Sequence, residues 1–131
     1  MKSLPRILVV DDDRDLRSSL EEQFTYEDFL VDTAANGLTA LEKITNNEYD
    51  IVLLDLKLPK MDGMTVLREM KKMGRLTNVI MLTASNDVAT ANECVKIGAK
   101  DYITKPYDPE ELLHIVNRVL SLQASKGGTA E

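Results

Sequence analysis

The chain has 131 residues, 44% of them hydrophobic, and a formal net charge of −6. This length is typical of a single domain, and the apolar runs are far shorter than the ~20 residues that a transmembrane helix needs. The acidic charge, without a concentrated Lys/Arg stripe, argues against direct contact with nucleic acid, and the lone cysteine, Cys94, excludes an internal disulfide. We therefore expect a cytoplasmic domain that contacts neither nucleic acid nor a membrane.

In the first half of the chain, short apolar runs alternate with amphipathic stretches, which is typical of repeated βα units. The predicted elements are a strand over 6–10, a helix that opens at 13 or 14, a weaker strand over 29–33, a helix between the turn at 36–37 and the stop at 46–47, and a strand over 49–54. Leu38, Leu41 and Ile44 recur at helical spacing and are expected on one side of the second helix.

The second half of the chain continues this alternation. The predicted elements are a helix over about 64–73, a strand over 78–83, a helix over 87–97, a strand over 101–104 and a helix from 109 to about 122. Asp108 is a suitable N-cap for the last helix, because its side chain can accept hydrogen bonds from free backbone N–H groups. We predict one domain over residues 1–122, followed by a tail over 123–131 that is disordered or begins a linker.

Carboxylates directly follow two of the predicted strands. Asp11, Asp12 and Asp13 follow the first strand. Asp55 follows the third. Carboxylates brought within a few ångströms repel one another and raise one another's pKa values, and a divalent cation removes that conflict. Capping of the next helix explains Asp13 by itself, whereas the other three acids predict a metal site.

A hydroxyl and a lysine stand at the ends of the next two strands. Thr83 ends the fourth strand, and Lys105 follows the fifth, just before Pro106. Alone, Lys105 would be an ordinary solvated lysine leaving a strand. Because the carboxyl ends of parallel strands converge on one crevice, we expect it beside the acids. The sequence thus predicts carboxylates, a hydroxyl and an ammonium in one site.

Four segments of the chain occur in the order and spacing of a known family. They are Leu8–Asp12, Leu54–Gly63, Leu82–Ala84 and Gly98–Pro106. Together they resemble the receiver domain of two-component response regulators, which includes the single-domain chemotaxis regulator, over about Arg6 to Leu120. The resemblance implies an α/β fold, with a doubly wound five-stranded parallel sheet in the order 2-1-3-4-5 within a flavodoxin-like three-layer sandwich.

The resemblance also implies phosphoryl transfer to Asp55 from the phosphohistidine of a sensor histidine kinase or of a phosphotransfer protein. Asp12, Asp55 and the backbone carbonyl of Lys57 would bind Mg²⁺, with Mn²⁺ as a substitute. Asp11 would bind the metal through water. Lys105 would pair first with the acids and then with a phosphoryl oxygen. Such a protein is a signalling switch and not an enzyme for other substrates, since it catalyses only its own phosphorylation and dephosphorylation.

In that family a hydroxyl residue and an aromatic residue transmit the signal, and Thr83 and Tyr102 occupy their positions here. Phosphorylation is expected to switch the face formed by residues 86–121. That face would bind a separate effector, a C-terminal output domain or a second copy of the chain. The final helix lacks the arginines of one dimerising subfamily, so a charge-laced dimer of that type is not expected. The resemblance further implies a cis peptide bond before Pro106.

Two positions differ from the fast-hydrolysing chemotaxis relatives and are expected to modulate the site. Lys57 and Ser85 replace an amide and an acid that help to place the attacking water. Neither replacement orients water well. We therefore predict a longer-lived acyl phosphate, which is suited to slower outputs such as transcription.

Three other functions fit the residues less well. A haloacid-dehalogenase-type phosphatase needs a second aspartate two residues after its nucleophile, where this chain has Lys57. A flavodoxin-like electron carrier needs a hydroxyl- and glycine-rich phosphate loop after the first strand, where Asp11, Asp12 and Asp13 would repel the flavin phosphate. A receiver-like module that binds partners without being phosphorylated is the third alternative, which the complete set of site residues disfavours.

Overall fold

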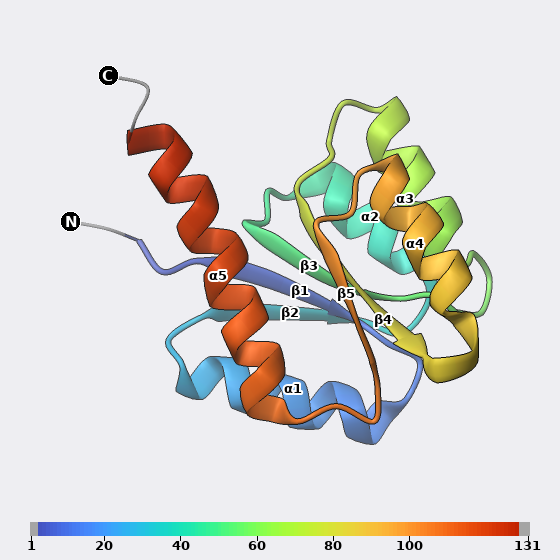
Figure 1. Cartoon of the computed structure of the whole chain (residues 1–131), viewed down its shortest axis with the longest axis horizontal. Helices are drawn as coiled ribbons and strands as arrows, with labels where there is room; N and C mark the ends of the chain where they lie inside the picture. Colours follow the sequence, from blue (N-terminus) through green and yellow to red (C-terminus); the bar gives the residue numbers. More distant parts are fainter. Residues whose placement is uncertain (1–2, 129–131) are drawn as a thin grey trace.

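The structure, a computed structural model, describes residues 3–128. Strands and helices alternate along this part of the chain (Figure 1). The elements are β1 (Arg6–Val10), α1 (Arg14–Tyr26), β2 (Leu30–Ala34), α2 (Gly37–Asn46), β3 (Ile51–Asp55), α3 (Gly63–Lys72), β4 (Asn78–Ala84), the 3-10 turn η1 (Ser85–Asp87), α4 (Val88–Ile97), β5 (Asp101–Lys105) and α5 (Pro109–Gly128). Within the described residues, no helix is both long enough and apolar enough to cross a membrane.

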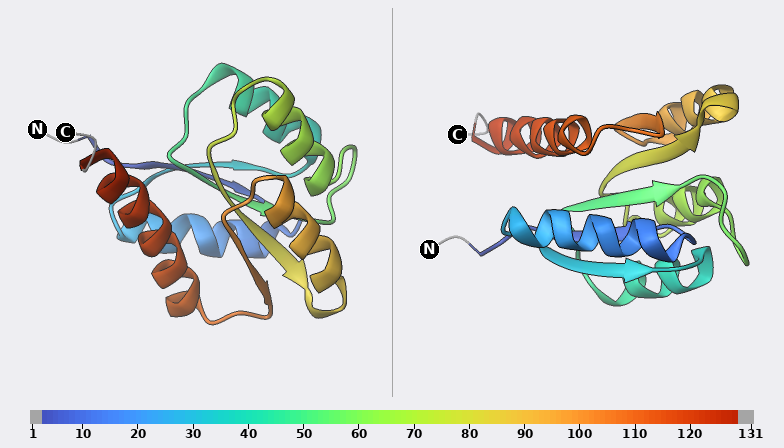
Figure 2. Two further views of the ribbon diagram at one scale, coloured as in Figure 1. Left: turned by 45° about the horizontal axis from the view of Figure 1, so that its top comes forward. Right: turned by 90° about the horizontal axis from the view of Figure 1, so that it is seen from below.

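The strands of the described chain form one parallel sheet in the order β2-β1-β3-β4-β5. Helices α1 and α5 pack on one face of the sheet, and α2, α3 and α4 pack on the other (Figures 1 and 2). The molecule is therefore a doubly wound α/β sandwich of three layers. This architecture confirms the predicted fold class and strand order.

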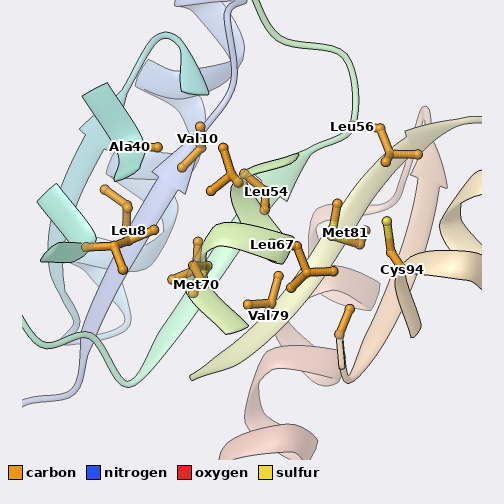
Figure 3. Close-up of a cluster of buried hydrophobic side chains, with 14 of the residues drawn as sticks. Leu8, Val10, Ala40, Leu54, Leu56, Leu67, Met70, Val79, Met81 and Cys94 are labelled. Carbon is orange, nitrogen blue, oxygen red and sulfur yellow. The ribbon is translucent and has the colours of Figure 1, made fainter. Parts of the chain in front are cut away.

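The core has two halves, because alternate side chains of a strand point to opposite faces of the sheet. In β1, Leu8 and Val10 contact the layer of α2, α3 and α4, whereas Ile7 and Val9 contact the layer of α1 and α5. Figure 3 shows the first half, in which Cys94 of α4 is fully buried. Every residue of the central strand β3 is buried, since helices cover both of its faces.

Aspartates cap the first and last helices as the sequence predicted. Oδ1 of Asp13 accepts hydrogen bonds from the backbone N–H groups of Asp15 and Leu16, at 3.0 and 3.2 Å. Oδ1 of Asp108 accepts one from the N–H of Glu110, at 2.9 Å. Each cap satisfies N–H groups that have no partner inside the helix. The carboxylate of Asp13 is thus engaged in capping α1.

Some element boundaries differ from the prediction. β2 and β3 begin slightly later than predicted, at Leu30 and Ile51, and α5 continues beyond its predicted end to Gly128. Between residue 122 and Gly127 the sequence contains no glycine or proline, and therefore no strong helix stop. The domain boundary after residue 122 stays a prediction, and 129–131 of the expected tail lie outside the described residues.

The apolar side predicted for the second helix is only partly buried. Leu38, one of the three residues expected on one side of this helix, is 50% exposed. The side chains that face the core are those of Ala40 and Ile44, with Leu41 partly buried. A β-carbon on Gly37 would lie 1.8 Å from a backbone oxygen in the loop before α3, so the start of this helix packs closely against that loop.

Candidate functional site

Three carboxylates meet at the carboxyl end of the sheet. Val10 and Leu54 are register partners in β1 and β3, so the acids that follow them emerge side by side. Asp11, Asp12 and Asp55 each offer one oxygen, and these atoms lie within 4.8 Å of one another. Asp11 and Asp55 are buried, and Asp12 is exposed. The structure thus brings together the acids that the sequence predicted for a metal site.

The ammonium of Lys105 lies between two of these acids. Its Nζ is 2.7 Å from Oδ2 of Asp11 and 2.9 Å from Oδ2 of Asp55. Lys105 ends β5, yet its side chain reaches past β4 to the ends of β1 and β3. The Lys105–Pro106 peptide bond is cis, the isomer that the resemblance implied. The lysine therefore belongs to the acid cluster and is not a solvated residue at a strand end.

Burial and charge act in opposite directions on the pKa values of this site. Burial raises the pKa of Asp55, the hydrogen bond from Lys105 opposes that shift, and the charge of Asp11 adds to it. Burial works to lower the pKa of Lys105, but its hydrogen bonds to Asp11 and Asp55 outweigh burial and raise it. The ammonium therefore stays charged at neutral pH and offsets the repulsion between the two carboxylates.

Backbone groups hold the two buried carboxylates in place. Oδ1 of Asp11 accepts a hydrogen bond from the N–H of Asp13 at 2.9 Å, and Oδ1 of Asp55 accepts one from the N–H of Lys57 at 3.2 Å. Three carboxylates face one ammonium, which leaves negative charge in excess. The donor atoms are hard carboxylate oxygens, and the exposed side of the cluster leaves room for water. This donor set fits Mg²⁺, which prefers oxygen ligands and keeps several waters.

A cavity of about 230 Å³ opens over the cluster. Its walls include Asp12, Asp55, Lys57, Asp87 and Lys105. A second cavity, of about 930 Å³, is larger, but it lies at the other end of β4 and none of the clustered acids lines it. The chemistry of the lining, and not the volume, therefore identifies the smaller cavity as the candidate site.

Thr83 and Tyr102 stand on adjacent strands near the cluster. Thr83 of β4 is fully buried, and its Oγ1 donates a hydrogen bond to the backbone oxygen of Ala84 at 3.2 Å. Tyr102 of β5 is half-buried and packs against the half of the core that faces α2, α3 and α4. Ser85 is exposed in η1, directly after β4. The roles of these residues in switching and hydrolysis stay predictions.

The sequence did not single out two residues that lie close to the cluster. Asp87 of η1 places Oδ2 3.3 Å from Nζ of Lys57. Burial raises the pKa of Tyr107 to about 12, and within residues 3–128 its shielded hydroxyl has no hydrogen-bond partner. In the sequence, Asp87 soon follows the predicted strand that ends in Thr83, and this position could have marked it as a site residue. No such signal marks Tyr107, which lies in the loop between β5 and α5 and packs against the half of the core that faces the layer of α1 and α5.

Known proteins match this chain in sequence and in structure. Residues 7–117 match the response regulator receiver domain family. The chain is 42% identical over 126 residues to the regulatory protein AtoC of Escherichia coli strain K12, across 96% of this chain and 27% of that protein. It is 41% identical over 108 residues to the response regulator MprA of Mycobacterium sp. strain KMS, across 82% of this chain and 47% of that protein.

A solved structure shows the same architecture. The receiver domain protein (CheY-like) of Methanospirillum hungatei JF-1 matches with a TM-score of 0.89 and 33% identity, across 95% of this chain and 99% of that one. The chain spans less than half of the length of the two sequence relatives. The family match covers most of the chain and includes every strand end described above. The chain therefore belongs to the response regulator receiver domain family of two-component signalling systems.

Proposed function

We propose that the chain is a phosphoacceptor switch, in which Asp55 receives a phosphoryl group from a phosphohistidine on a sensor histidine kinase or a phosphotransfer protein. The strongest support is the contact of Lys105 with both Asp11 and Asp55 inside a group of three carboxylates. Folding alone does not require such a group. Phosphoryl transfer requires each part of it, namely a nucleophile, metal ligands and a fixed positive charge.

The proposed reaction is an in-line displacement at phosphorus. A carboxylate oxygen of Asp55 forms a new O–P bond while the N–P bond of the phosphohistidine breaks, and the departing histidine nitrogen keeps the electron pair. Lys105 then moves from the Asp55 carboxylate to a phosphoryl oxygen and keeps its contact with Asp11. The hydroxyl of Thr83 leaves the backbone oxygen of Ala84 and donates to another phosphoryl oxygen.

The proposed metal ligands are the carboxylates of Asp12 and Asp55 and the backbone carbonyl of Lys57, with Asp11 holding metal-bound water. The clustering of the three acids supports this assignment. Bound Mg²⁺, or Mn²⁺ in its place, supplies positive charge that offsets the excess of carboxylates and stabilises the phosphoryl oxygens. The N–H of Lys57 holds the Asp55 carboxylate in position for the transfer.

The proposed output is a change in the face formed by residues 86–121, which contains α4, β5 and much of α5. Thr83 is buried just before this face, and Tyr102 lies half-buried within it, so a movement of the hydroxyl can be passed to the ring. The face would bind a separate effector, an output domain of a longer polypeptide or a second copy of the chain. The greater length of the relatives supports an output domain.

In this proposal the protein acts in the cytoplasm, and its reactions are the gain and loss of its own phosphoryl group.

Lys57 and Ser85 are poor at orienting an attacking water, so the acyl phosphate should outlast that of the chemotaxis regulators. The measurement is the release of phosphate from the purified phosphoprotein beside a chemotaxis regulator under the same conditions. Equal half-lives would contradict this expectation.

Intact mass spectrometry after incubation with acetyl phosphate and Mg²⁺ tests the proposed function. We expect one added phosphate on the wild type and none on Asp55→Asn. Asp28→Asn is a matched control, because it makes the same chemical change at an exposed residue between α1 and β2. Asparagine also tolerates the positive φ of 66° at that position. This control should gain one phosphate. Phosphate on Asp55→Asn, or none on the wild type, would contradict the proposal.

A further inference from the structure

An ion pair spans the rim of the cavity over the acid cluster. Lys57 lies in the loop after β3, and Asp87 lies in η1 after β4. Nζ of Lys57 is 3.3 Å from Oδ2 of Asp87. Both residues line the cavity that also exposes Asp55 and Lys105. The pair therefore joins the loop that follows the proposed acceptor to the turn that precedes α4.

Helix capping does not account for the side chain of Asp87. This residue stands at the N-terminus of α4, where an aspartate usually accepts hydrogen bonds from free N–H groups, but its side chain makes no such bond. Its Oδ2 is shielded from solvent and has no hydrogen-bond partner in the part of the chain that the structure describes. The ammonium of Lys57 is the positive charge in contact with that oxygen. The acid thus turns toward the site and away from its own helix.

In this ion pair the side chain of Asp87 is packed against the protein, whereas that of Lys57 is largely exposed. The side chain of Asp87 is 22% exposed, and that of Lys57 is 75% exposed. An ammonium on a long, flexible stem can move to a new anion, while the packed carboxylate keeps its place. The backbone N–H of Lys57 binds Oδ1 of Asp55 at 3.2 Å, so the ammonium is tethered beside the acceptor. Without Asp87 it would be free to meet an anionic phosphodonor.

We propose that Asp87 is a positioning residue: it holds the Lys57 ammonium at the rim of the cavity and thereby restrains phosphorylation of Asp55 by small anionic phosphodonors. This inference rests on the proposed function. With acetyl phosphate as donor, a carboxylate oxygen of Asp55 forms an O–P bond, the O–P bond to the acetyl group breaks, and acetate leaves with the electron pair. Asp87 touches none of these atoms and acts on the step through the position of Lys57.

The expected size of the effect on the phosphorylation rate follows from the solvent exposure of the Lys57–Asp87 pair. Exposed ion pairs have coupling energies that correspond to roughly two- to fivefold in a rate or an equilibrium constant. Asp87→Asn keeps the size of the side chain and removes its charge. We expect this variant to raise the initial rate of phosphorylation by acetyl phosphate by that factor, because the released ammonium attracts the anionic donor.

A double-mutant cycle separates the action through Lys57 from a general charge effect. The four proteins are the wild type, Asp87→Asn, Lys57→Gln and the double variant, and the readout is the initial rate of phosphate gain by intact mass with acetyl phosphate and Mg²⁺. We expect Asp87→Asn to speed the reaction in the wild-type background and to have no effect in the Lys57→Gln background. Equal acceleration in both backgrounds would overturn the inference, since Asp87 would then simply repel the donor. No acceleration in the wild-type background would overturn it as well.

Asp87→Glu provides the conservative control. Its carboxylate can still reach Lys57, so the slow rate should return. A rate as high as that of Asp87→Asn would assign position 87 a packing role and overturn the inference. Thermal unfolding of each variant checks that the fold is retained. If the wild type gains no phosphate, the proposed function is contradicted. If the wild type gains phosphate but Asp87→Asn has the same effect in both backgrounds, only this inference is overturned.

Discussion

At the scale of single residues, Lys105 determines the charge balance of the site. Its ammonium contacts one oxygen of Asp11 and one of Asp55, while its own side chain is 28% exposed. A divalent cation bound at the cluster would supply positive charge to the same carboxylates as the lysine. The two therefore oppose each other electrostatically when the metal binds, because like charges a few ångströms apart repel.

Replacing Lys105 should strengthen metal binding. Lys105→Gln removes one positive charge from the cluster, and we expect Mg²⁺ affinity to rise on the order of tenfold at low salt. Isothermal titration of the unphosphorylated protein measures this change. Lys100→Gln is the matched control, since Lys100 is exposed and makes no contact with the clustered acids. Equal or weaker Mg²⁺ binding by Lys105→Gln would contradict the proposal that the ammonium lies beside the metal site.

At the scale of elements, the junction of β3 with α3 positions Asp55, the proposed acceptor. The N–H of Gly63 donates a hydrogen bond to the backbone oxygen of Leu56 at 2.8 Å. A β-carbon on Gly63 would come within 2.2 Å of the backbone oxygen of Asp55. The start of α3 can therefore pack against the strand end only because position 63 has no side chain. Asp62 caps the same helix by accepting a hydrogen bond from the N–H of Thr65 at 2.9 Å.

Gly63→Ala should disturb both stability and phosphorylation. The added methyl group forces α3 away from Asp55, and we expect a loss of roughly 1–3 kcal/mol in the free energy of unfolding. Gly74→Ala is the control, because no atom lies within 4 Å of a β-carbon there and only its φ of +66° is unfavourable. An alanine with that φ costs about 1 kcal/mol of the free energy of unfolding, and position 74 lies after the far end of α3 from the proposed acceptor. Urea unfolding and the phosphorylation rate measure the two effects. Normal phosphorylation of Gly63→Ala would contradict the proposed tight junction.

Element types were predictable from the sequence because their signals are local. Apolar runs bounded by charged residues marked the strands, and Asp13 and Asp108 marked helix starts that the structure confirms. The exposure of Leu38 was not predictable, because it depends on how the start of α2 packs against a loop distant in sequence. The extra length of α5 was missed because the polar composition after Leu122 was taken to end the helix.

The same distinction applies to the site. The convergence of Asp11, Asp55 and Lys105 could be predicted, since parallel strands place their carboxyl ends together. The pair between Lys57 and Asp87 could not, because it depends on how two separate loops approach each other above the sheet.

At the scale of the whole molecule, the proposed switch connects one end of the sheet to one side of the sandwich. The acid cluster lies at the carboxyl ends of the strands, and the face formed by residues 86–121 includes α4 and β5 (Figure 1). Thr83 is fully buried between them. A signal from the cluster to that face would therefore pass through packed residues, as a two-state rearrangement requires.

Thr83→Ala should leave phosphorylation largely intact and uncouple it from the output face. In the wild type we expect phosphorylation to change amide hydrogen exchange over residues 86–121, and in Thr83→Ala we expect that change to be lost. Thr83→Ser keeps the hydroxyl and should keep the response. Thr77→Ala removes a hydroxyl that donates to the backbone oxygen of Tyr49 at 2.8 Å, away from the cluster, and should also respond. An unchanged response in Thr83→Ala would contradict the proposed coupling.

Asp55 is the side chain that we propose to be phosphorylated, and chemical trapping can locate the phosphoryl group directly. Borohydride reduces an aspartyl phosphate to homoserine, so treatment of the phosphorylated wild type followed by peptide mass spectrometry locates the acyl phosphate. We predict homoserine at position 55 and at no other aspartate. Homoserine at Asp11 or Asp12 with an unmodified Asp55, or phosphate that survives reduction on another type of side chain, would contradict the proposed role of Asp55.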